Sequence, residues 1–507
     1  MKRFTFNNGP VNRFKVTILA SLLGLTISTA DAQTTVQTGQ AAPASNRFSL
    51  RQCIDIALQN NLQVKQGQLN VQGSELQLRQ SKLNLLPSVN GFASQSFSSG
   101  RNINPTTNAF VTSSVSSNNY QLSGQVTVFN GFALQRTIKQ NDLFLQSTQQ
   151  NLLATQNNVA LLVVQNYLNV LTYQEQLDIA RRQVVTSQGQ LDRTTKLVNA
   201  GTLAEAQLYD LRAQVANDEL AVVNAQNNLD LAKLALLQAM NLPAGNSGAP
   251  TPNTLEIEKY QLDDPTLEPY SASAQQVYEA ALQFMPDVKA AELRVRSDAA
   301  GVEVAKAGLY PTLTVSGSLS TLYSNVGLQK QFENGSVVSP DPLTVVLPNG
   351  QQQQFYIVQT AYRYEDYRYG EQLNNNLNRG LSINLNIPIF GRFQARNRIT
   401  NATITQKTSE ITAENTKLTL RQNIESAYTS MLAAANRYRA TLVQVESLEK
   451  AFQAAESRFN AGALNSVDYN IAKNNLDTAR ANLVQAKFDY VFRTKILDFY
   501  QNKPLSF

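Results

Sequence analysis

The side chains that could carry out chemistry are few in this chain of 507 residues, which has no His, no Trp and a single Cys, Cys53. Without an imidazole there is no ordinary general base and no ordinary zinc site, so any catalysis would depend on carboxylates, lysines or hydroxyls. No glycine-rich loop of the phosphate-binding type is found, so no nucleotide site is expected. The sequence therefore favours a protein that is not an enzyme and has no cofactor or metal ion.

The first 32 residues have the pattern of a secretory signal peptide. Four basic residues precede an apolar run from Val16 to Ile27, and Ala30 and Ala32 then stand in the small-residue spacing of a cleavage site. This run is too short to cross a bilayer as a helix, which needs about 20 residues. An uncleaved N-terminal anchor is the alternative. Cleavage would remove four bases and one acid and lower the formal net charge from +6 to +3, so we infer no nucleic-acid partner.

The rest of the chain is an internal duplication. Residues 57–87 match residues 281–311 at an offset of 224, with ten of the 31 positions identical, and an offset of 261 relates the later parts of the two halves. The halves therefore differ by a net insertion of 37 residues. The expected domains are the signal peptide 1–32, a first structural repeat 33–243, a connector 244–273, and a second repeat 274–504 with an enlarged loop at 321–380.

Each half holds two segments in which apolar and polar residues alternate. Such alternation predicts strands with one apolar and one polar face, and nine to eleven residues are what a tilted strand needs to cross a bilayer. No stretch of 18 apolar residues follows the leader, so a membrane-embedded form would have to use strands. The predicted strands are 88–97, 120–128, 312–323 and 381–389.

Long helical segments without proline follow the second strand of each half, over 133–199 and 394–460. Each would be about 100 Å long at 1.5 Å per residue, which is deeper than a compact domain. Apolar residues in the second recur with the coiled-coil period, although an ordinary helical bundle would show the same pattern. Gly201 and Gly462 stand where these helices end, so each chain segment is expected to double back as a hairpin. Single helices are expected over 50–86, 202–240, 274–310 and 463–501.

The predicted strands are too few for one chain to form a membrane barrel, because the smallest such barrels have eight. Unpaired strand edges are costly in lipid, so several copies must share one barrel. A periplasmic adaptor with a coiled-coil hairpin is one rival, but it predicts a single hairpin and no membrane strands. A secreted fibrous coiled coil is another, but it predicts unbroken heptads. The duplication and the paired amphipathic strands argue against both.

The chain resembles the TolC-like outer membrane factors, or outer membrane efflux proteins, across nearly all of its mature length. The resemblance rests on the duplication, on "CIDIALQNN", on "VFNGFALQRTI" and "IPIFGRFQARNRI" at the strand-to-helix junctions, and on "RFNAGALNSVDYNIAKNNLDTARANLVQAKFDY" at 458–490. It implies a mainly helical fold with membrane strands, in which a homotrimer forms one 12-stranded β-barrel in the lipid of the Gram-negative outer membrane. A coiled-coil α-barrel would continue it into the periplasm. The implied function is a passive exit channel for efflux or type I secretion, linked by a periplasmic adaptor to an inner-membrane transporter.

The resemblance also points to residues at the hairpin turns. Family members carry acidic residues shortly after the second tip glycine, and Asp468 stands at a matching position, where three copies would form a ring that favours cations. A solvated Asp in the first turn of a helix is the alternative. The chain departs from the family pattern at Ile471, where a second acid is frequent, and at Leu464, where a gate-locking Arg can stand. Gln207 replaces the acid in the first repeat, although Asp210 follows. We therefore expect apolar contacts at the tip and a weaker cation site.

The turn segments 197–206 and 458–467 are candidates for docking the adaptor, because small residues permit close approach of another helical hairpin. Simple helix turns are the alternative. The expected docking residues are Asn199, Gly201, Leu203, Asn460, Gly462 and Leu464. The strand-to-helix junctions are expected at Pro87, Phe129, Gly131, Pro311, Pro388, Phe390 and Gly391.

Overall fold

The structure is a computed structural model of the chain. It describes residues 47–103, 108–242, 250–259, 270–326, 329–348, 350–366 and 368–503. The expected signal peptide at 1–32 and most of the expected connector at 244–273 lie outside these residues.

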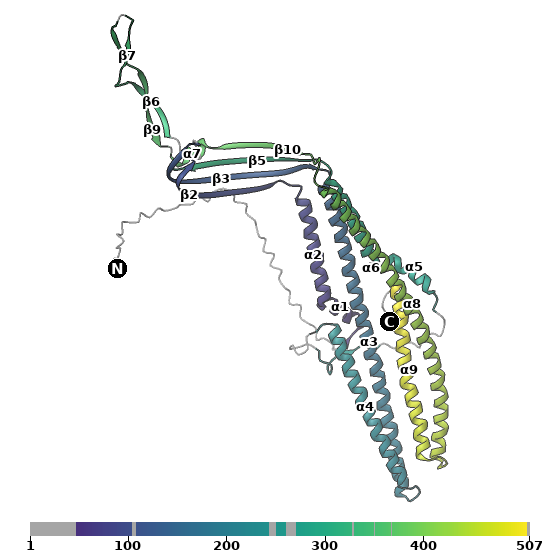
Figure 1. The fold of residues 1–507 in the computed structure, drawn as a ribbon. Coiled ribbons are helices and arrows are strands. Elements are labelled where there is room, and N and C mark those ends of the chain that lie inside the picture. The colour runs from purple at the N-terminus through teal and green to yellow at the C-terminus, as the bar shows by residue number, and fades with distance from the viewer. Residues whose placement is uncertain are drawn as a thin grey trace, which may run out of the picture. The chain divides into compact units, whose positions relative to one another are not determined.

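The two longest helices have the bounds expected from the sequence (Figure 1). Helices α3 (Ala133–Asn199) and α8 (Gln394–Asn460) have 67 residues each. Helices α4 (Ala206–Ala239) and α9 (Ser466–Tyr500) return along them as antiparallel partners. They begin four and three residues later than expected, because the turns after Gly201 and Gly462 occupy more of the chain than the glycines alone indicate. None of the described helices is both long and apolar enough to cross a membrane.

The single helices expected at 50–86 and 274–310 are wrong, because each is broken into two. Helix α1 (Leu50–Asn60) and α2 (Leu62–Leu83) are separated at Asn61, whose ψ of 128° is extended. The side-chain oxygen of Asn61 accepts hydrogen bonds from the N–H groups of Gln63 and Val64 and so caps α2. Helix α5 (Ala274–Phe284) and α6 (Pro286–Ala307) are separated at Met285, with a ψ of 123°. A residue before proline is disfavoured in the helical region, which explains the second break.

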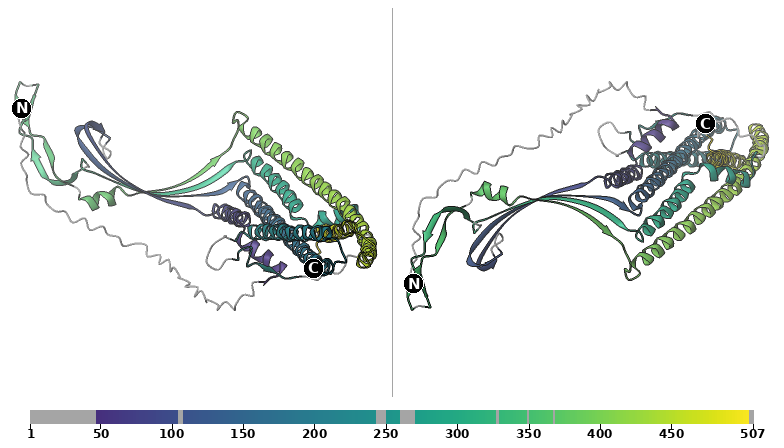
Figure 2. Two further views of the ribbon diagram at one scale, coloured as in Figure 1. Left: turned by 90° about the horizontal axis from the view of Figure 1, so that it is seen from below. Right: turned by 90° about the horizontal axis from the view of Figure 1, so that it is seen from above.

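Four helices form a row that continues the strands of the largest sheet. Figure 2 shows α2, α3, α6 and α8 in this order, and the contacts between α2 and α3, α3 and α6, and α6 and α8 agree with it. Along the chain, α2 leads into β2 (Ser88–Ile103), β3 (Phe110–Asn130) into α3, α6 into β5 (Thr312–Ser324), and β10 (Asn378–Asn386) into α8. The same order of elements in both halves is what the duplication predicts.

Each half has its own apolar core where the short helices meet the long one. In the first half, Tyr167 of α3 is fully buried, and its hydroxyl donates hydrogen bonds to the carbonyls of Phe48 and Glu258 at 3.3 and 2.8 Å. These carbonyls flank the short parallel pair β1 (Arg47–Phe48) and β4 (Glu256–Ile257), so the connector after the first repeat is fixed to its core. Cys53 lies in the same cluster, and burial raises the pKa of its thiol to about 12. In the second half, Ile424, Met431 and Tyr438 of α8 pack against α5 and α9.

The largest sheet contains the four strands that the sequence predicts. They are antiparallel and lie in the order β10, β5, β3, β2. The strands of the first half extend well beyond the expected 88–97 and 120–128. The register places Leu122 of β3 beside Gly91 of β2 and Leu319 of β5, and Gly317 of β5 beside Leu381 of β10. One face therefore collects the apolar residues. They include Val89, Ala93, Leu122, Val126, Leu313, Val315, Leu319, Leu381, Ile383 and Leu385. The opposite face carries mainly Ser, Thr, Asn and Gln, with Phe92 as an exposed aromatic exception.

The segment 321–380, expected as an enlarged loop, contains strands of its own. It contains an antiparallel pair, β6 (Gln329–Val338) and β9 (Val358–Asp366), and a smaller pair, β7 (Leu343–Val346) and β8 (Gln352–Phe355). Gly335 and Gly350 have positive φ, 81° and 78°, where the strands bulge and turn. The short helix α7 (Tyr369–Asn375) follows and leads into β10. Short runs of Val, Tyr and Phe between Gly and Pro explain the strands.

Candidate functional site

The two helical hairpins end in turns of the same geometry. Gly201 and Gly462 have φ of 71° and 75°, the left-handed region that favours glycine. In the second turn the N–H of Ala463 donates to the carbonyl of Arg458 and that of Gly462 to Phe459; the first turn repeats both bonds at Thr202 and Gly201. This is the Schellman arrangement at a helix C-terminus, so the tip glycines expected from the sequence do close the hairpins.

The two tips of one chain are joined to each other. The hydroxyl of Ser466 donates to Asp210 at 2.7 Å, and Arg193 donates to the side-chain oxygen of Asn460 at 2.7 Å. Between these contacts lies an apolar cluster of buried Leu211, Phe459 and Tyr469, against which Leu464 packs. The tips are thus a unit within the subunit, held by both polar and apolar contacts.

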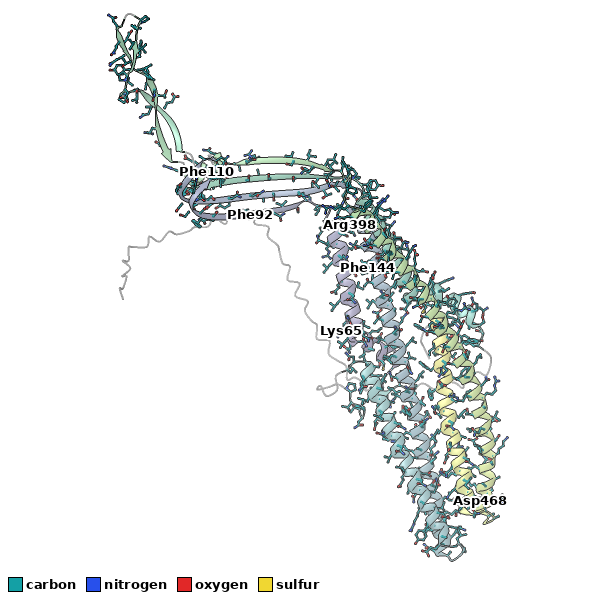
Figure 3. The ribbon with its side chains drawn as sticks, viewed as in Figure 1. Lys65, Phe92, Phe110, Phe144, Arg398 and Asp468 are labelled. Carbon is teal, nitrogen blue, oxygen red and sulfur yellow. The ribbon has the colours of Figure 1, made fainter. Side chains whose placement is uncertain are left out.

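Asp468 lies exposed at the start of α9, near the tip (Figure 3). The N–H of Asp468 donates to the side-chain oxygen of Asn465 at 2.8 Å, and the Asn465 amide donates back to an Asp468 carboxylate oxygen at 3.0 Å. The first of these bonds satisfies one free N–H group of the helix N-terminus, where a negative charge is also favourable. The single chain therefore shows Asn465 as the cap of α9 and Asp468 in the first turn, with a carboxylate that remains accessible to solvent.

The other residues expected at the tips have different surroundings. Ile471 is 54% exposed one turn beyond Asp468 on α9. Gln207 and Leu203 are half-buried, whereas Asn199 is exposed at the end of α3. The candidates are therefore together at the hairpin ends. Asp210, Asn460 and Leu464 contact the other hairpin.

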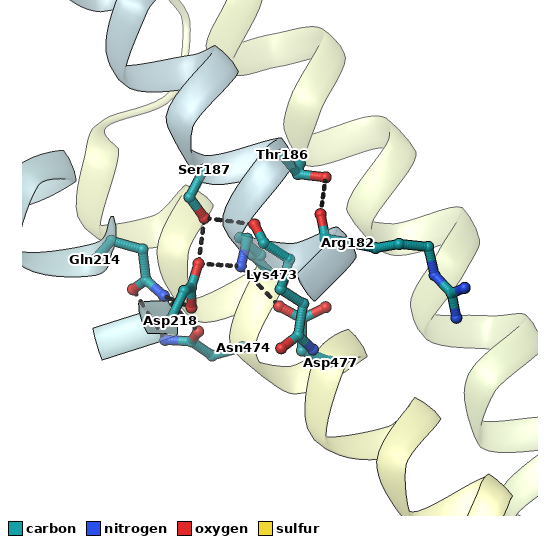
Figure 4. Close-up of polar contacts among 9 residues, drawn as sticks. Arg182, Thr186, Ser187, Gln214, Asp218, Lys473, Asn474 and Asp477 are labelled. Carbon is teal, nitrogen blue, oxygen red and sulfur yellow. Dashed lines mark hydrogen bonds and ion pairs between the residues drawn. The ribbon is translucent and has the colours of Figure 1, made fainter. Parts of the chain in front are cut away.

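A buried polar cluster further along the hairpins was not predicted from the sequence (Figure 4). The ammonium of Lys473 lies 2.9 Å from a carboxylate oxygen of Asp218 and 2.8 Å from one of Asp477. Ser187 donates a short hydrogen bond to the Asp218 carboxylate, and Gln214 donates to its other oxygen at 2.8 Å. Side-chain exposure is 3% for Lys473, 8% for Asp218 and 16% for Asp477. Because Ser187 and Asp218 belong to the first hairpin and Lys473 to the second, this cluster ties α3 and α4 to α9.

One sequence signal could have found this cluster. Tyr469, Lys473 and Leu476 follow the spacing of one helix face, so a lysine occupies a position of the apolar stripe of α9. A buried lysine needs a partner with the opposite charge. Asp477, four residues later, looks like an ordinary surface ion pair, and nothing local in the sequence points to Asp218, more than 250 residues away.

Tyr469 is the buried aromatic residue that connects the tip to this cluster. Its ring stacks on Phe459 at 4.7 Å and is 1% exposed. Burial, and then the carboxylates of Glu456, Asp477 and Asp218, raise the pKa of Tyr469 to about 12. Because the pKa is higher in the folded than in the unfolded chain, the neutral phenol contributes stability below about pH 10. That contribution is lost as the pH rises through about 12.

The strand-to-helix junctions use left-handed residues in both repeats. Gly131 has a φ of 66°, and a Cβ there would lie 2.7 Å from the Cβ of Tyr310. Phe132 and Phe393, which begin α3 and α8, have φ of 64° and 58°. In the second repeat the residue with positive φ before the Phe is Arg392, at 50°, and Gly391 lies directly before it.

Aromatic rings mark both junctions. Phe129 contacts Phe132 edge to face with centroids 5.4 Å apart, and Phe390 contacts Phe393 in the same way at 5.8 Å. Pro87 and Pro311 precede β2 and β5, and Pro388 follows β10, so these prolines stand where strands begin or end. Aromatic residues at the border of an apolar strand band are typical of membrane-spanning sheets.

These features define a class of protein. A duplicated chain in which a sheet with one apolar face continues into a wall of long helical hairpins has the architecture of an outer membrane channel subunit. The family model for "Outer membrane efflux protein" matches residues 53–242 and 277–493, and the chain belongs to this family. The family places the chain in the Gram-negative outer membrane.

Individual relatives are distant. "Outer membrane protein TolC" of Escherichia coli (strain K12) is 24% identical over 327 residues, which cover 64% of this chain and 57% of that protein. TolC of Salmonella enteritidis is 22% identical over 424 residues, covering 82% and 74%. The crystal structure of the outer membrane protein VceC from Vibrio cholerae has a TM-score of 0.65 at 15% identity and covers 90% of this chain and 97% of that one. The fold is therefore shared over nearly the whole length.

Proposed function

We propose that the chain is the exit channel of a tripartite efflux or type I secretion system, through which substrates pass passively to the exterior. The proposal rests above all on the open sheet. The edge strands β2 and β10 have no partner on their outer sides among the described residues, and the apolar face is exposed, with Leu381 at 76%. Open edges and an apolar face are stable in lipid only if another chain pairs with the edges.

Closure by identical copies agrees with the strand directions. Because the sheet has four antiparallel strands, its two edge strands run in opposite directions. β10 of one copy could therefore pair with β2 of the next copy, and all strands would remain antiparallel to their neighbours. Three copies would supply twelve strands, the number that the resemblance implies. The Ser, Thr, Asn and Gln face would then line a polar pore, as in other membrane barrels.

The partners belong to the same proposal. The helical hairpins would continue the pore into the periplasm, and their tips would dock a periplasmic adaptor that connects to an inner-membrane transporter. The exposed parts of both turns, around Asn199 and Gly201 and around Gly462, support this role because small residues allow a second hairpin to approach closely. Asp468 remains our candidate for a cation-binding ring at the entrance.

The experiment is conductance in planar bilayers. The detergent-purified chain is expected to insert and give discrete single-channel steps that need neither nucleotide nor a metal ion. Protein that enters the bilayer without conducting, or that stays soluble as a monomer without detergent, would contradict an exit channel.

A further inference from the structure

The paired strands of residues 329–366, which we call the ribbon, are the part of the chain that the proposed function does not use. β6 pairs with β9 and β7 with β8, and these pairs form two-stranded sheets separate from the four-stranded one. Two-stranded ribbons are marginally stable in water, and their open edges readily pair with other chains. Because no other strand among the described residues pairs with its edges, the ribbon is open to a partner from another chain.

The outer part of the ribbon exposes apolar side chains. Val338 faces Val358 across the strands, and Leu343 faces Phe355, all with exposures between 47% and 63%. Val345 shares the face of Leu343 and Phe355, whereas the opposite face carries Thr344, Gln354 and Gln352 around Val346. Adjacent exposed apolar side chains of this kind indicate an interaction surface.

The charge pattern restricts the partner. Between residues 334 and 362 the only charged residue is Asp341. The base of the ribbon, in contrast, carries acids and bases, including the Arg363 and Glu365 ion pair. A neutral surface of Val, Phe and Gln has no charged group that could pair with a charged partner. Identical copies of this surface do not repel one another, and their contact would bury the apolar side chains of both copies.

The ribbon is fixed to the end of the sheet. The side chain of Gln372 in α7 accepts from the N–H of Ser324 at 3.0 Å and donates to its carbonyl at 3.1 Å, and Asn376 donates to the carbonyl of Leu322 at 2.7 Å. Tyr369 contacts the hydroxyl of Tyr120 at 2.8 Å. These bonds attach the C-terminal end of the inserted segment to β5 and β3. At its N-terminal end, the side-chain oxygen of Asn325 accepts from the N–H of Ser116 in β3 at 2.7 Å. Each subunit of an assembly would therefore carry its ribbon at the same rim.

We propose that the ribbons of neighbouring subunits pack against one another across the channel exit through the face of Leu343, Val345 and Phe355. The inference rests on the proposed trimer. A barrel of twelve strands about 4.8 Å apart and tilted by about 40° has a radius of roughly 12 Å. The ten residues of β6 alone extend about 33 Å at 3.3 Å per residue. The ribbons are therefore long enough to meet at the axis, and attachment to one rim gives them an effective concentration on the order of millimolar.

Cysteine cross-linking tests the contact. Cys53 is buried, so it is replaced by Ala, and Val345→Cys is introduced in that background with Gln354→Cys, on the other face, as the matched control. A short bismaleimide is added to the protein in outer membranes. We expect Val345→Cys chains to become linked to each other and Gln354→Cys chains to remain mostly unlinked. Adding Leu343→Ser and Phe355→Ser should abolish the linkage.

The outcomes separate this proposal from the proposed function. Unlinked chains in a preparation whose native mass is that of a trimer would overturn the ribbon contact alone, as would linkage to a different protein. A native mass of one chain would overturn both.

Discussion

The buried lysine between the hairpins allows the sharpest test of the structure. Lys473→Met removes the cation that faces Asp218 and Asp477 and leaves two carboxylates close together. Removing one partner of a buried ion pair costs about 3–5 kcal/mol, because the remaining charge is uncompensated. The hydrogen bonds from Ser187 and Gln214 to Asp218 stay in place, and Asp477 is partly open to water. We therefore expect Lys473→Met to lower the free energy of unfolding by about 3 kcal/mol, near the lower end of this range.

The assay is chemical unfolding of the detergent-purified protein, with Lys450→Met as the control. Lys450 is exposed on α8, and a surface substitution of this kind should change the stability by less than about 0.5 kcal/mol. Combining Lys473→Met with Asp218→Asn and Asp477→Asn should restore most of the stability, because the unpaired charges are gone. If Lys473→Met lowered the free energy of unfolding no more than Lys450→Met does, the cluster would not hold the two hairpins together.

Three further substitutions test other parts of the structure. Asp468→Ala should lower single-channel conductance for cations and weaken block by divalent cations; unchanged values would mean that Asp468 is only a solvated acid in the first turn of α9. Tyr469→Phe should match the parent protein at pH 8, but between pH 10 and 12 the parent should lose thermal stability faster, because only the parent has a buried phenol to ionise at this position. Equal melting curves at pH 11 would contradict a buried, shifted Tyr469. Gly131→Ala should cost about 1–2 kcal/mol for the left-handed backbone and more for the clash with Tyr310. Gly391→Ala, where a Cβ meets nothing within 4 Å, is its control, and equal yields of folded protein would show that the first junction is not strained.

The sequence predicted the parts of the fold that depend on regular periodicity. Helices α3 and α8 have their expected bounds because a phenylalanine junction begins them and Gly201 or Gly462 ends them. The alternation in β5 and β10 placed their apolar residues on one face correctly. These signals are local, so one sequence suffices to read them.

The features that the sequence did not predict depend on residues that interrupt a regular pattern and on contacts between distant parts of the chain. Asn61 caps α2 within a stretch that otherwise looks helical, and such a cap is hard to separate from a surface asparagine. The ribbon is built of short pairs whose partners are set by bulges and turns rather than by long alternation. The site residues were placed by resemblance, and the contact between Asp210 and Ser466 crosses from one repeat to the other, which no local pattern reveals.

The proposed channel requires that several chains contribute their four strands to one closed barrel. Native mass spectrometry of the protein released from detergent micelles measures how many chains assemble. We expect a single species with the mass of three mature chains; a stable species with the mass of one chain would show that the strands are not shared.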